Sequence, residues 1–152
     1  MNRLTVIVGA PAAGKTTFAQ ALDGHTRICL DDIREELTGD ASSQEATASA
    51  VAVAKVRLVS ILGDGGAVVL DATSTTRRER ADWIGLAMEL GVGTVATVIH
   101  PPLAVCLARN ASRDRQVPED VVEEMWRRVD RITVTELLDE GVGWVERIGG
   151  TT

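Results

Sequence analysis

The sequence is short of aromatic residues, lysine and cysteine. Among 152 residues there is no tyrosine and one phenylalanine, and two of the 16 basic residues are lysines. So few aromatic rings argue against a base-stacking platform for nucleic acid. The longest apolar runs, such as Ala67–Leu70, are far shorter than the ~20 residues of a membrane-spanning helix. Gly9 and Pro11 interrupt the first apolar run too early for a signal peptide, so we expect a cytoplasmic protein.

The length and the net charge further limit the kinds of protein that this chain can be. A chain of 152 residues has the size of one domain, and we predict a single domain over residues 1–152. The net charge of −6 argues against a broad surface for long nucleic acid, but it leaves room for a small basic pocket around one phosphorylated end. Cys29 and Cys106 lie in apolar segments without CxxC spacing, so we expect buried free thiols.

Strand-like and helix-like patterns alternate along the chain. The expected strands are Leu4–Val8, Arg27–Leu30, Ala67–Leu70, Thr94–Ile99 and Val142–Ile148. The expected helices are 15–22, one beginning at 32, 41–62, 77–90, one opened by Pro101-Pro102, and one running from Pro118 to Gly141. In 41–62, Ala52, Val56, Val59 and Leu62 share one helical face. Such alternation is typical of an α/β fold with a five-stranded parallel sheet sandwiched by helices. Ligands of such sheets bind beyond the carboxyl ends of the strands.

A glycine-rich loop follows the first strand and fits the phosphate-loop pattern GxxxxGK[ST]. Its backbone N–H groups and the helix N-terminus behind it suit the β- and γ-phosphates of a nucleotide. Lys15 is placed to reach the transferred phosphate and Thr16 to hold Mg²⁺. The predicted nucleotide-binding residues are Gly9, Ala10, Pro11, Ala12, Ala13, Gly14, Lys15, Thr16 and Thr17.

Two adjacent carboxylates follow the second strand. Asp32 precedes a helix with Glu35 three residues later, which is the spacing of a capping box. Asp31 is left without a structural role, and Arg34 lies in the first helical turn, where a cation opposes the helix dipole. Transfer of a phosphoryl group to a hydroxyl needs a carboxylate that accepts the hydroxyl proton. Asp31 is therefore the candidate base, and Asp32 is the alternative candidate. It is also possible to explain Asp31 and Arg34 without function, as an exposed carboxylate and a solvated arginine.

The third strand ends in Asp71, in the manner of a Walker B segment. Asp71 is a candidate to bind Mg²⁺ through water or to orient the base. The hydroxyl residues 73–76 that follow either contact the acceptor or cap the helix that begins near Arg77. The charge run Arg77–Arg80 predicts a solvated start of that helix.

A polar segment, Arg109–Gln116, carries two arginines at i and i+4. On a helix, Arg109 and Arg113 share a face and repel each other unless an anion lies between them. Guanidinium groups suit the charge that phosphoryl transfer spreads over three oxygens. Val117-Pro118 ends the segment, so we predict a helical lid over about 109–118. The alternative is an exposed helix end with Asp114 as the ion-pair partner.

Taken together, these motifs resemble the 5′-hydroxyl polynucleotide kinase domain. The phosphate loop is joined by Asp31-Asp32-Ile33-Arg34, by Asp71-Ala72-Thr73 and by Arg109-Asn110-x-x-Arg113 with Val117-Pro118. The resemblance covers most of the chain. It implies an adenylate-kinase-like P-loop NTPase fold, ATP and Mg²⁺ as cofactors, and the 5′-OH end of RNA or DNA as acceptor.

The same resemblance implies a role for each matching residue. Asp31 is implied as general base, and Arg34 as the group that grips an acceptor-side phosphate. Lys15 and Thr16 are implied to serve the donor. Arg109 and Arg113 are the implied lid arginines on the transferring phosphates. No DxDGT motif is present, so 3′-phosphatase activity is not expected.

Other functions fit the same residues. The main alternative is a kinase for a small hydroxyl substrate, such as a sugar acid, a nucleoside or an antibiotic. A non-catalytic ATP-binding module and, by analogy of fold, a kinase for a sugar nucleotide are further alternatives. A GTPase is not expected, because the guanine-reading NKxD motif is absent.

Overall fold

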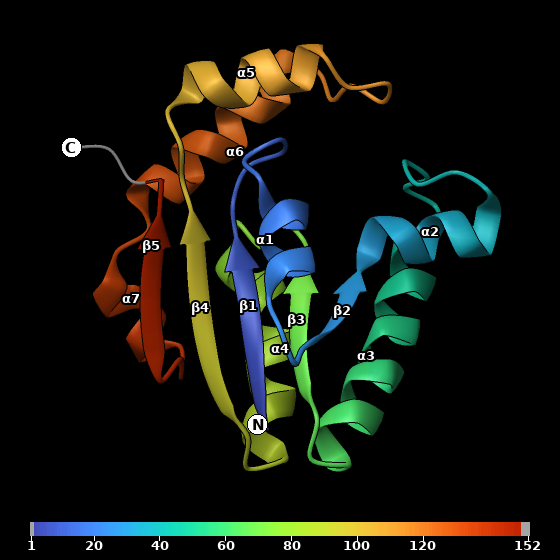
Figure 1. Cartoon of the computed structure of the whole chain (residues 1–152), viewed down its shortest axis with the longest axis vertical. Helices are drawn as coiled ribbons and strands as arrows, with labels where there is room; N and C mark the ends of the chain where they lie inside the picture. Colours follow the sequence, from blue (N-terminus) through green and yellow to red (C-terminus); the bar gives the residue numbers. More distant parts are fainter. Residues whose placement is uncertain (1, 150–152) are drawn as a thin grey trace.

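The strands form one parallel sheet in the order β2-β3-β1-β4-β5 (Figure 1). The structure is a computed structural model that describes residues 2–149. The strands are β1 (Arg3–Val8), β2 (Thr26–Cys29), β3 (Ala67–Asp71), β4 (Gly93–Ile99) and β5 (Trp144–Ile148). All four pairings are parallel, with β1 in the centre. The predicted fold class is confirmed.

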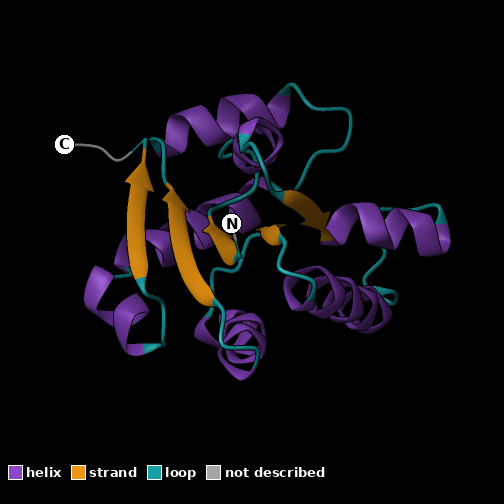
Figure 2. Cartoon of the chain, turned by 60° about the horizontal axis from the view of Figure 1, so that its bottom comes forward, coloured by secondary structure: helices purple, strands orange, loops and turns teal. Residues whose placement is uncertain are grey.

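Helices lie on both sides of the sheet (Figure 2). They are α1 (Lys15–Ala21), α2 (Leu30–Thr38), α3 (Thr47–Gly63), α4 (Arg77–Glu89), α5 (Leu103–Ala111), α6 (Glu119–Arg131) and α7 (Val134–Asp139). None of the helices in the described part of the chain has both the length and the apolarity needed to cross a bilayer.

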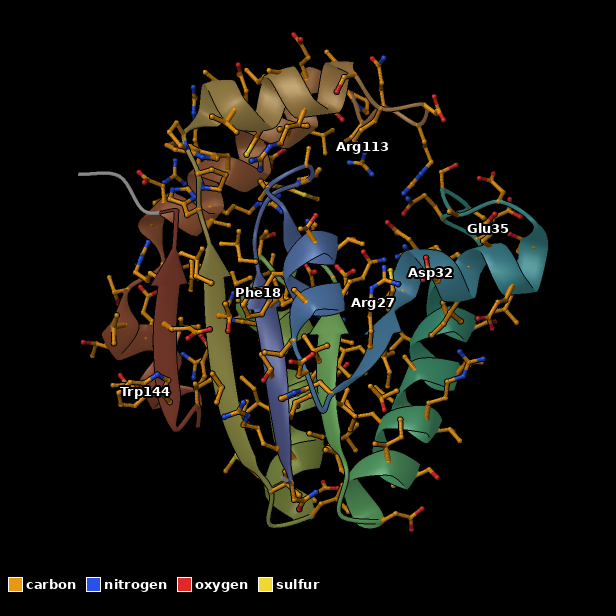
Figure 3. The ribbon with its side chains drawn as sticks, viewed as in Figure 1. Phe18, Arg27, Asp32, Glu35, Arg113 and Trp144 are labelled. Atoms are coloured by element: carbon orange, nitrogen blue, oxygen red, sulfur yellow. The ribbon has the colours of Figure 1, made fainter. Side chains whose placement is uncertain are left out.

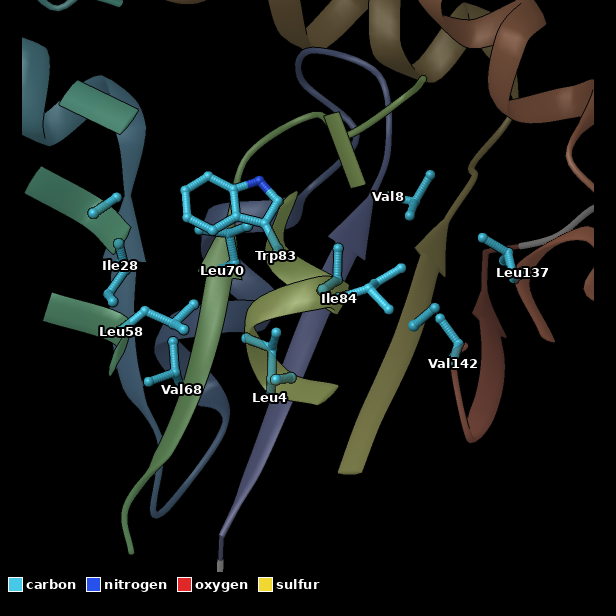
Figure 4. Packing of buried hydrophobic residues seen from close by; sticks show 14 of the residues in the cluster. Leu4, Val8, Ile28, Leu58, Val68, Leu70, Trp83, Ile84, Leu137 and Val142 are labelled. Carbon is cyan, nitrogen blue, oxygen red and sulfur yellow. The ribbon is translucent and has the colours of Figure 1, made fainter. Parts of the chain in front are cut away.

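Two apolar clusters, one on each face of the sheet, hold the layers together. Alternate side chains of β1 enter different clusters, because successive residues of a strand point to opposite faces. Leu4, Val6 and Val8 pack with α3 and α4, and Figure 4 shows Leu4 in this cluster with Trp83 and Ile84 of α4. Ile7 joins the smaller cluster, under α1, α5 and α6. A β1 buried on both faces fixes the phosphate loop that follows it.

Both cysteines are buried free thiols, as predicted. Cys29 ends β2 and Cys106 lies in α5. Burial raises the pKa of Cys29 to about 11, so its thiol stays protonated at neutral pH.

The predicted apolar face of the Ala-rich helix is wrong for three of its four residues. Val56 and Val59 are 71% and 37% exposed, and Ala52 is also exposed. The buried face is instead the i+4 row Ala50, Ala54, Leu58 and Leu62. Apolar side chains occur all round this helix, so periodicity alone does not choose a face. The helix also begins at Thr47 rather than at 41.

The expected long helix from Pro118 to Gly141 is two helices. α6 ends at Arg131 and α7 begins at Val134. Thr133 and Glu136 form a reciprocal capping box at the start of α7, which favours a new helix there over continuation of the old one.

The charge run at the start of α4 is only partly solvated. Arg77, Arg78 and Glu79 are exposed, as expected, but Arg80 is 3% exposed. Its Nε lies 2.8 Å from Oε1 and its Nη2 2.9 Å from Oε2 of Glu140, which is equally buried. Arg80 Nη1 also donates to the carbonyl of Ser74. The pair anchors the loop between β3 and α4, one wall of the site described below.

We predict that Arg80→Ala lowers the free energy of unfolding by about 3–5 kcal/mol, because it leaves the Glu140 carboxylate buried without a partner. Urea unfolding followed by circular dichroism measures this loss. The matched control is Arg128→Ala, which breaks an exposed pair with Glu124 and should cost less than about 1 kcal/mol. Equal losses in the two variants would contradict a buried, energetically coupled pair.

Candidate active site

A cavity of about 1100 Å³ lies beyond the carboxyl ends of the strands. Its wall brings together the phosphate loop, the start of α2, the end of β3 and the segment after α5. All the predicted catalytic and metal-binding residues contribute to this wall: Lys15, Thr16, Asp31, Arg34, Asp71, Arg109 and Arg113. Of the predicted nucleotide-binding residues, Pro11–Thr17 line it, whereas Gly9 and Ala10 lie behind it.

The phosphate loop is held in a tight turn that demands glycine at two positions. A Cβ at Gly9 would lie 2.9 Å from the carbonyl oxygen of Ile99, which is too close for any other residue. Gly14, the N-cap of α1, has φ +105°. Gly9 N–H donates to the carbonyl of Thr73, so the loop is also attached to the chain that follows β3. These constraints explain the two glycines of the motif.

Lys15 extends back across this loop. Its Nζ donates to the carbonyl of Ala10 at 2.8 Å. The pKa of Lys15 is lowered to about 8: burial lowers it most and the charge of Arg113 adds to this, while Asp71 and Asp31 oppose the shift. The side chain of Lys15 is therefore charged at neutral pH, and a phosphate bound in the loop would stabilise that charge.

Thr16 and Asp71, the two candidate Mg²⁺ ligands, lie side by side in the structure. Thr16 Oγ1 donates to Asp71 Oδ2 at 2.9 Å, although 55 residues separate them. A hydroxyl and a carboxylate oxygen are ligand types that suit Mg²⁺ in nucleotide sites, so this pair fits the ion. Asp71 is almost fully buried and is also bound by Arg27 of β2, a residue that the motifs did not single out. The sequence feature that could have indicated a role for Arg27 is its place as a charged residue inside a short apolar strand.

The two adjacent carboxylates have separate roles in the structure. The capping box predicted for Asp32 is absent: α2 begins at Leu30, its N-cap is Cys29, and no side chain caps it. Asp32 instead pairs with Arg27 at 2.7 Å and is not part of the cavity wall; Figure 3 labels both residues, near the junction of β2 and α2. Asp31 faces the cavity from the first turn of α2. Of the two candidates for the base, Asp31 alone lines the cavity.

Two arginines hold the carboxylate of Asp31. Arg34 Nη1 donates to Oδ1 at 2.5 Å, and Arg115 Nη2 donates to Oδ2 at 2.9 Å. Arg34 comes from the same helix, whereas Arg115 belongs to the predicted lid. The side chain of Asp31 remains 46% exposed. Arg115 was not predicted from the sequence. The one feature that could have indicated it is that it is a third arginine in the same segment as Arg109 and Arg113.

The segment that holds the lid arginines is only partly helical. α5 ends at Ala111, so Arg109 is helical and Arg113 lies in the following turn; the expected shared helical face is therefore wrong. Arg109 Nη1 donates to the carbonyl of Ala13, and both arginines line the cavity. Figure 3 shows Arg113 below the segment after α5, on the side of the phosphate loop. Asp114 forms no ion pair within residues 2–149.

Asn110 explains how a loop of irregular shape stays in place. Its amide donates to the carbonyl of Val117 at 2.7 Å, and its oxygen accepts from Val117 N–H at 3.0 Å. This buried side chain closes the turn 111–116 in the way that a strand partner would. The turn then presents Arg113 and Arg115 toward the cavity.

The hydroxyl residues after Asp71 divide between the two expected roles. Thr76 caps α4: its Oγ1 accepts from Glu79 N–H at 3.2 Å. Thr73 lines the cavity. Ser74 and Thr75 are buried, and neither hydroxyl has a hydrogen-bond partner in the described chain.

Residues 4–132 match the family model AAA_33, described as an AAA domain. The chain belongs to this family of P-loop kinases. One similar protein is the L-seryl-tRNA(Sec) kinase of Methanococcus maripaludis, which is 25% identical over 136 residues. That alignment covers 84% of this chain and 52% of the relative, so the chain spans about half the length of the curated relative.

Solved structures of other proteins share the fold of this chain. A chain of the Pnkp1/Rnl/Hen1 RNA repair complex superposes with a TM-score of 0.74 at 23% identity, over 84% of this chain and 44% of that one. Shikimate kinase from Acinetobacter baumannii superposes with a TM-score of 0.59 at 15% identity, over 100% and 84%. At these identities the likeness establishes the fold.

We predict that nucleotide affinity falls as pH rises above about 8. Below that pH, Lys15 is already charged in the free protein; above it, binding must take up a proton, which costs up to about tenfold in affinity per pH unit. Calorimetric titration of ADP between about pH 7 and about pH 9.5 measures this dependence. In Lys15→Ala, affinity should be lower and independent of pH over this range. A wild-type affinity that stays flat to about pH 9.5 would contradict a lowered Lys15 pKa.

Proposed function

We propose that the protein is an ATP- and Mg²⁺-dependent phosphotransferase that moves the γ-phosphate to a hydroxyl, with the 5′-OH end of a polynucleotide as acceptor. One observation carries the proposal: a single cavity holds a phosphate loop with three cations on one side and a carboxylate flanked by two cations on the other. The first group suits a triphosphate, and the second suits a hydroxyl beside an anion.

The donor side consists of the phosphate loop with Lys15, Arg109 and Arg113. The loop's N–H groups and these cations stabilise the negative charge that spreads over the transferred group. Thr16 and Asp71 are the residues that would hold Mg²⁺, which supplies further neutralisation of the β- and γ-phosphates when bound. Arg109 lies in the last turn of α5 and Arg113 in the turn that follows, so both reach the phosphates from outside the sheet.

The acceptor side is arranged around Asp31. The acceptor oxygen attacks the γ-phosphorus, the bond from that phosphorus to the bridging oxygen breaks, and ADP leaves. The hydroxyl proton passes to the carboxylate of Asp31. In the free protein each oxygen of Asp31 accepts from one arginine, and each keeps a second lone pair that can accept from the acceptor hydroxyl.

Two features favour a polynucleotide end over an uncharged small molecule. Arg34 and Arg115 together exceed the charge of Asp31, so this side has a surplus cation for a phosphate next to the reacting hydroxyl. The names of two relatives, a kinase of seryl-tRNA and a protein of an RNA repair complex, both refer to RNA. The net charge of −6 is consistent with contacts to the terminal nucleotides only.

We predict label transfer from γ-labelled ATP with Mg²⁺ to a short 5′-OH oligonucleotide. An oligonucleotide with a 5′-phosphate should take up none. Asp31→Asn should reduce turnover by about 10²–10⁴, because it removes the base. Asp32→Asn should reduce it far less, and Glu35→Gln, an exposed acid on the same helix, is the matched control.

Gluconate and nucleosides are the competing acceptors in the same assay. Label found only on a small molecule would overturn the polynucleotide proposal and leave the kinase chemistry. Binding of ATP without transfer to any acceptor would favour a non-catalytic module. Equal losses in Asp31→Asn and Asp32→Asn would contradict the assignment of the base.

We predict that Arg115→Ala raises the KM for the oligonucleotide by about tenfold, the effect of losing one charged contact, while the KM for ATP changes little. Steady-state kinetics with each substrate varied in turn measures both constants. Arg128→Ala on α6 removes an arginine of similar exposure far from Asp31 and serves as control. A rise in the KM for ATP alone would instead assign Arg115 to the donor.

A further inference from the structure

Arg27 is not part of the cavity wall: it lines a separate groove between β2, α2 and α3, and it contacts Asp71 and Asp32. It is part of β2, the strand at one edge of the sheet, and its side chain is 22% exposed. Its guanidinium makes three contacts with two carboxylates: Nε donates a hydrogen bond to Asp71, Nη1 donates one to Asp32, and Nη2 adds an ion-pair contact with Asp71. Neither the phosphate loop nor the acceptor motif includes this residue.

The contacts with Asp71 converge on one carboxylate oxygen. Oδ2 accepts from Arg27 Nε at 2.9 Å and lies 2.8 Å from Nη2, and it also accepts from Thr16 Oγ1 at 2.9 Å. Within residues 2–149, no hydrogen bond to Oδ1 is present. The side chain of Asp71 lines the cavity. Arg27 therefore fixes the rotation of the carboxylate and leaves one oxygen for another ligand.

The third contact extends this arrangement to the acceptor helix. Arg27 Nη1 donates to Asp32 Oδ2 at 2.7 Å, and Asp32 directly follows Asp31 in the first turn of α2. One planar guanidinium thus sets the end of β3 and the start of α2 relative to each other. A lysine could not make all three contacts, because its ammonium lacks the forked geometry.

We propose that Arg27 is a positioning residue for the Mg²⁺ of the donor nucleotide: it orients Asp71 so that Thr16 and the free oxygen Oδ1 face the ion or a water bound to it. The inference rests on the Mg²⁺-ATP part of the proposed function. Outer hydrogen bonds of this kind orient metal ligands, and their loss typically reduces metal affinity about 10–100-fold. A merely structural Arg27 would neutralise Asp71 and affect stability without changing the affinity for the metal.

The test is binding of Mn²⁺, a spectroscopic substitute for Mg²⁺, to the protein saturated with ADP, measured by electron paramagnetic resonance. In Arg27→Gln we expect the Mn²⁺ dissociation constant to rise about 10–100-fold. Affinity for ADP without metal should stay within about twofold, because Arg27 lies outside the phosphate loop. Arg27→Lys should regain part of the loss, since it restores charge but not the fork.

Arg57→Gln is the matched control. Arg57 lies on α3, pairs with Glu36 of α2, and shares a shallow groove with Arg27 on the outer side of β2. Since it does not touch Asp71, its loss should leave Mn²⁺ affinity unchanged. Asp32→Ala removes only the third contact, so Mn²⁺ affinity should fall less than in Arg27→Gln.

Two outcomes would overturn the inference. One is wild-type Mn²⁺ affinity in both Arg27→Gln and Arg27→Lys, with only a lower midpoint of urea unfolding; this would make Arg27 structural while leaving the phosphotransferase proposal intact. The other is absence of Mn²⁺ and ADP binding by the wild-type protein, which would remove the donor site itself. If Arg27→Gln does not fold, the Arg27→Lys measurement decides between the outcomes.

Discussion

The buried carboxylate of Asp71 is the charge around which the site is organised. An ionised carboxylate taken out of water costs several kcal/mol unless charged or polar donors surround it. Here the donors come from two other parts of the sheet edge: Thr16 at the start of α1 and Arg27 in β2. The hydrogen bonds to the Asp71 carboxylate therefore connect the ends of β2 and β3 with the start of α1, which follows β1. The phosphate loop gains a fixed neighbour on the side where the metal is expected.

The cations of the site oppose one another in the absence of a ligand. Lys15, Arg109 and Arg113 line one cavity, and both burial and the charge of Arg113 lower the pKa of Lys15. Such an arrangement disfavours the empty state and favours a polyanion. The backbone carbonyls of Ala10 and Ala13 accept hydrogen bonds from Lys15 and Arg109, so these side chains are held near their places before a phosphate arrives. Less reorganisation is then needed on binding.

Apart from Arg109 and Arg113, which their i, i+4 spacing singled out, the parts of the site that were predicted from the sequence lie next to strand ends. Parallel strands place their carboxyl ends at one edge, so Lys15, Asp31 and Asp71 could be brought together from local patterns. Arg27, Asn110 and Arg115 were missed because their roles depend on partners that local spacing does not specify; Arg115, for example, meets Asp31 across 84 residues. The buried pair of Arg80 with Glu140, 60 residues apart, was read as solvated for the same reason. In α3, apolar residues all round the helix left the buried face undetermined.

The contact between Asp31 and Arg115 links the state of the predicted lid to the state of the base. Arg115 belongs to the turn that Asn110 closes, and the same turn presents Arg113 to the donor side. In the proposed reaction, a hydroxyl that competes with Arg115 for Asp31 would weaken the contact of this turn with α2, and phosphates that attract Arg113 would draw the same turn toward the phosphate loop. Both substrates therefore act on one short segment. Because the ion pair is about half exposed, its own strength is small, and either substrate can shift it. In the proposed mechanism, occupancy of both halves of the cavity would therefore act on the position of this one turn.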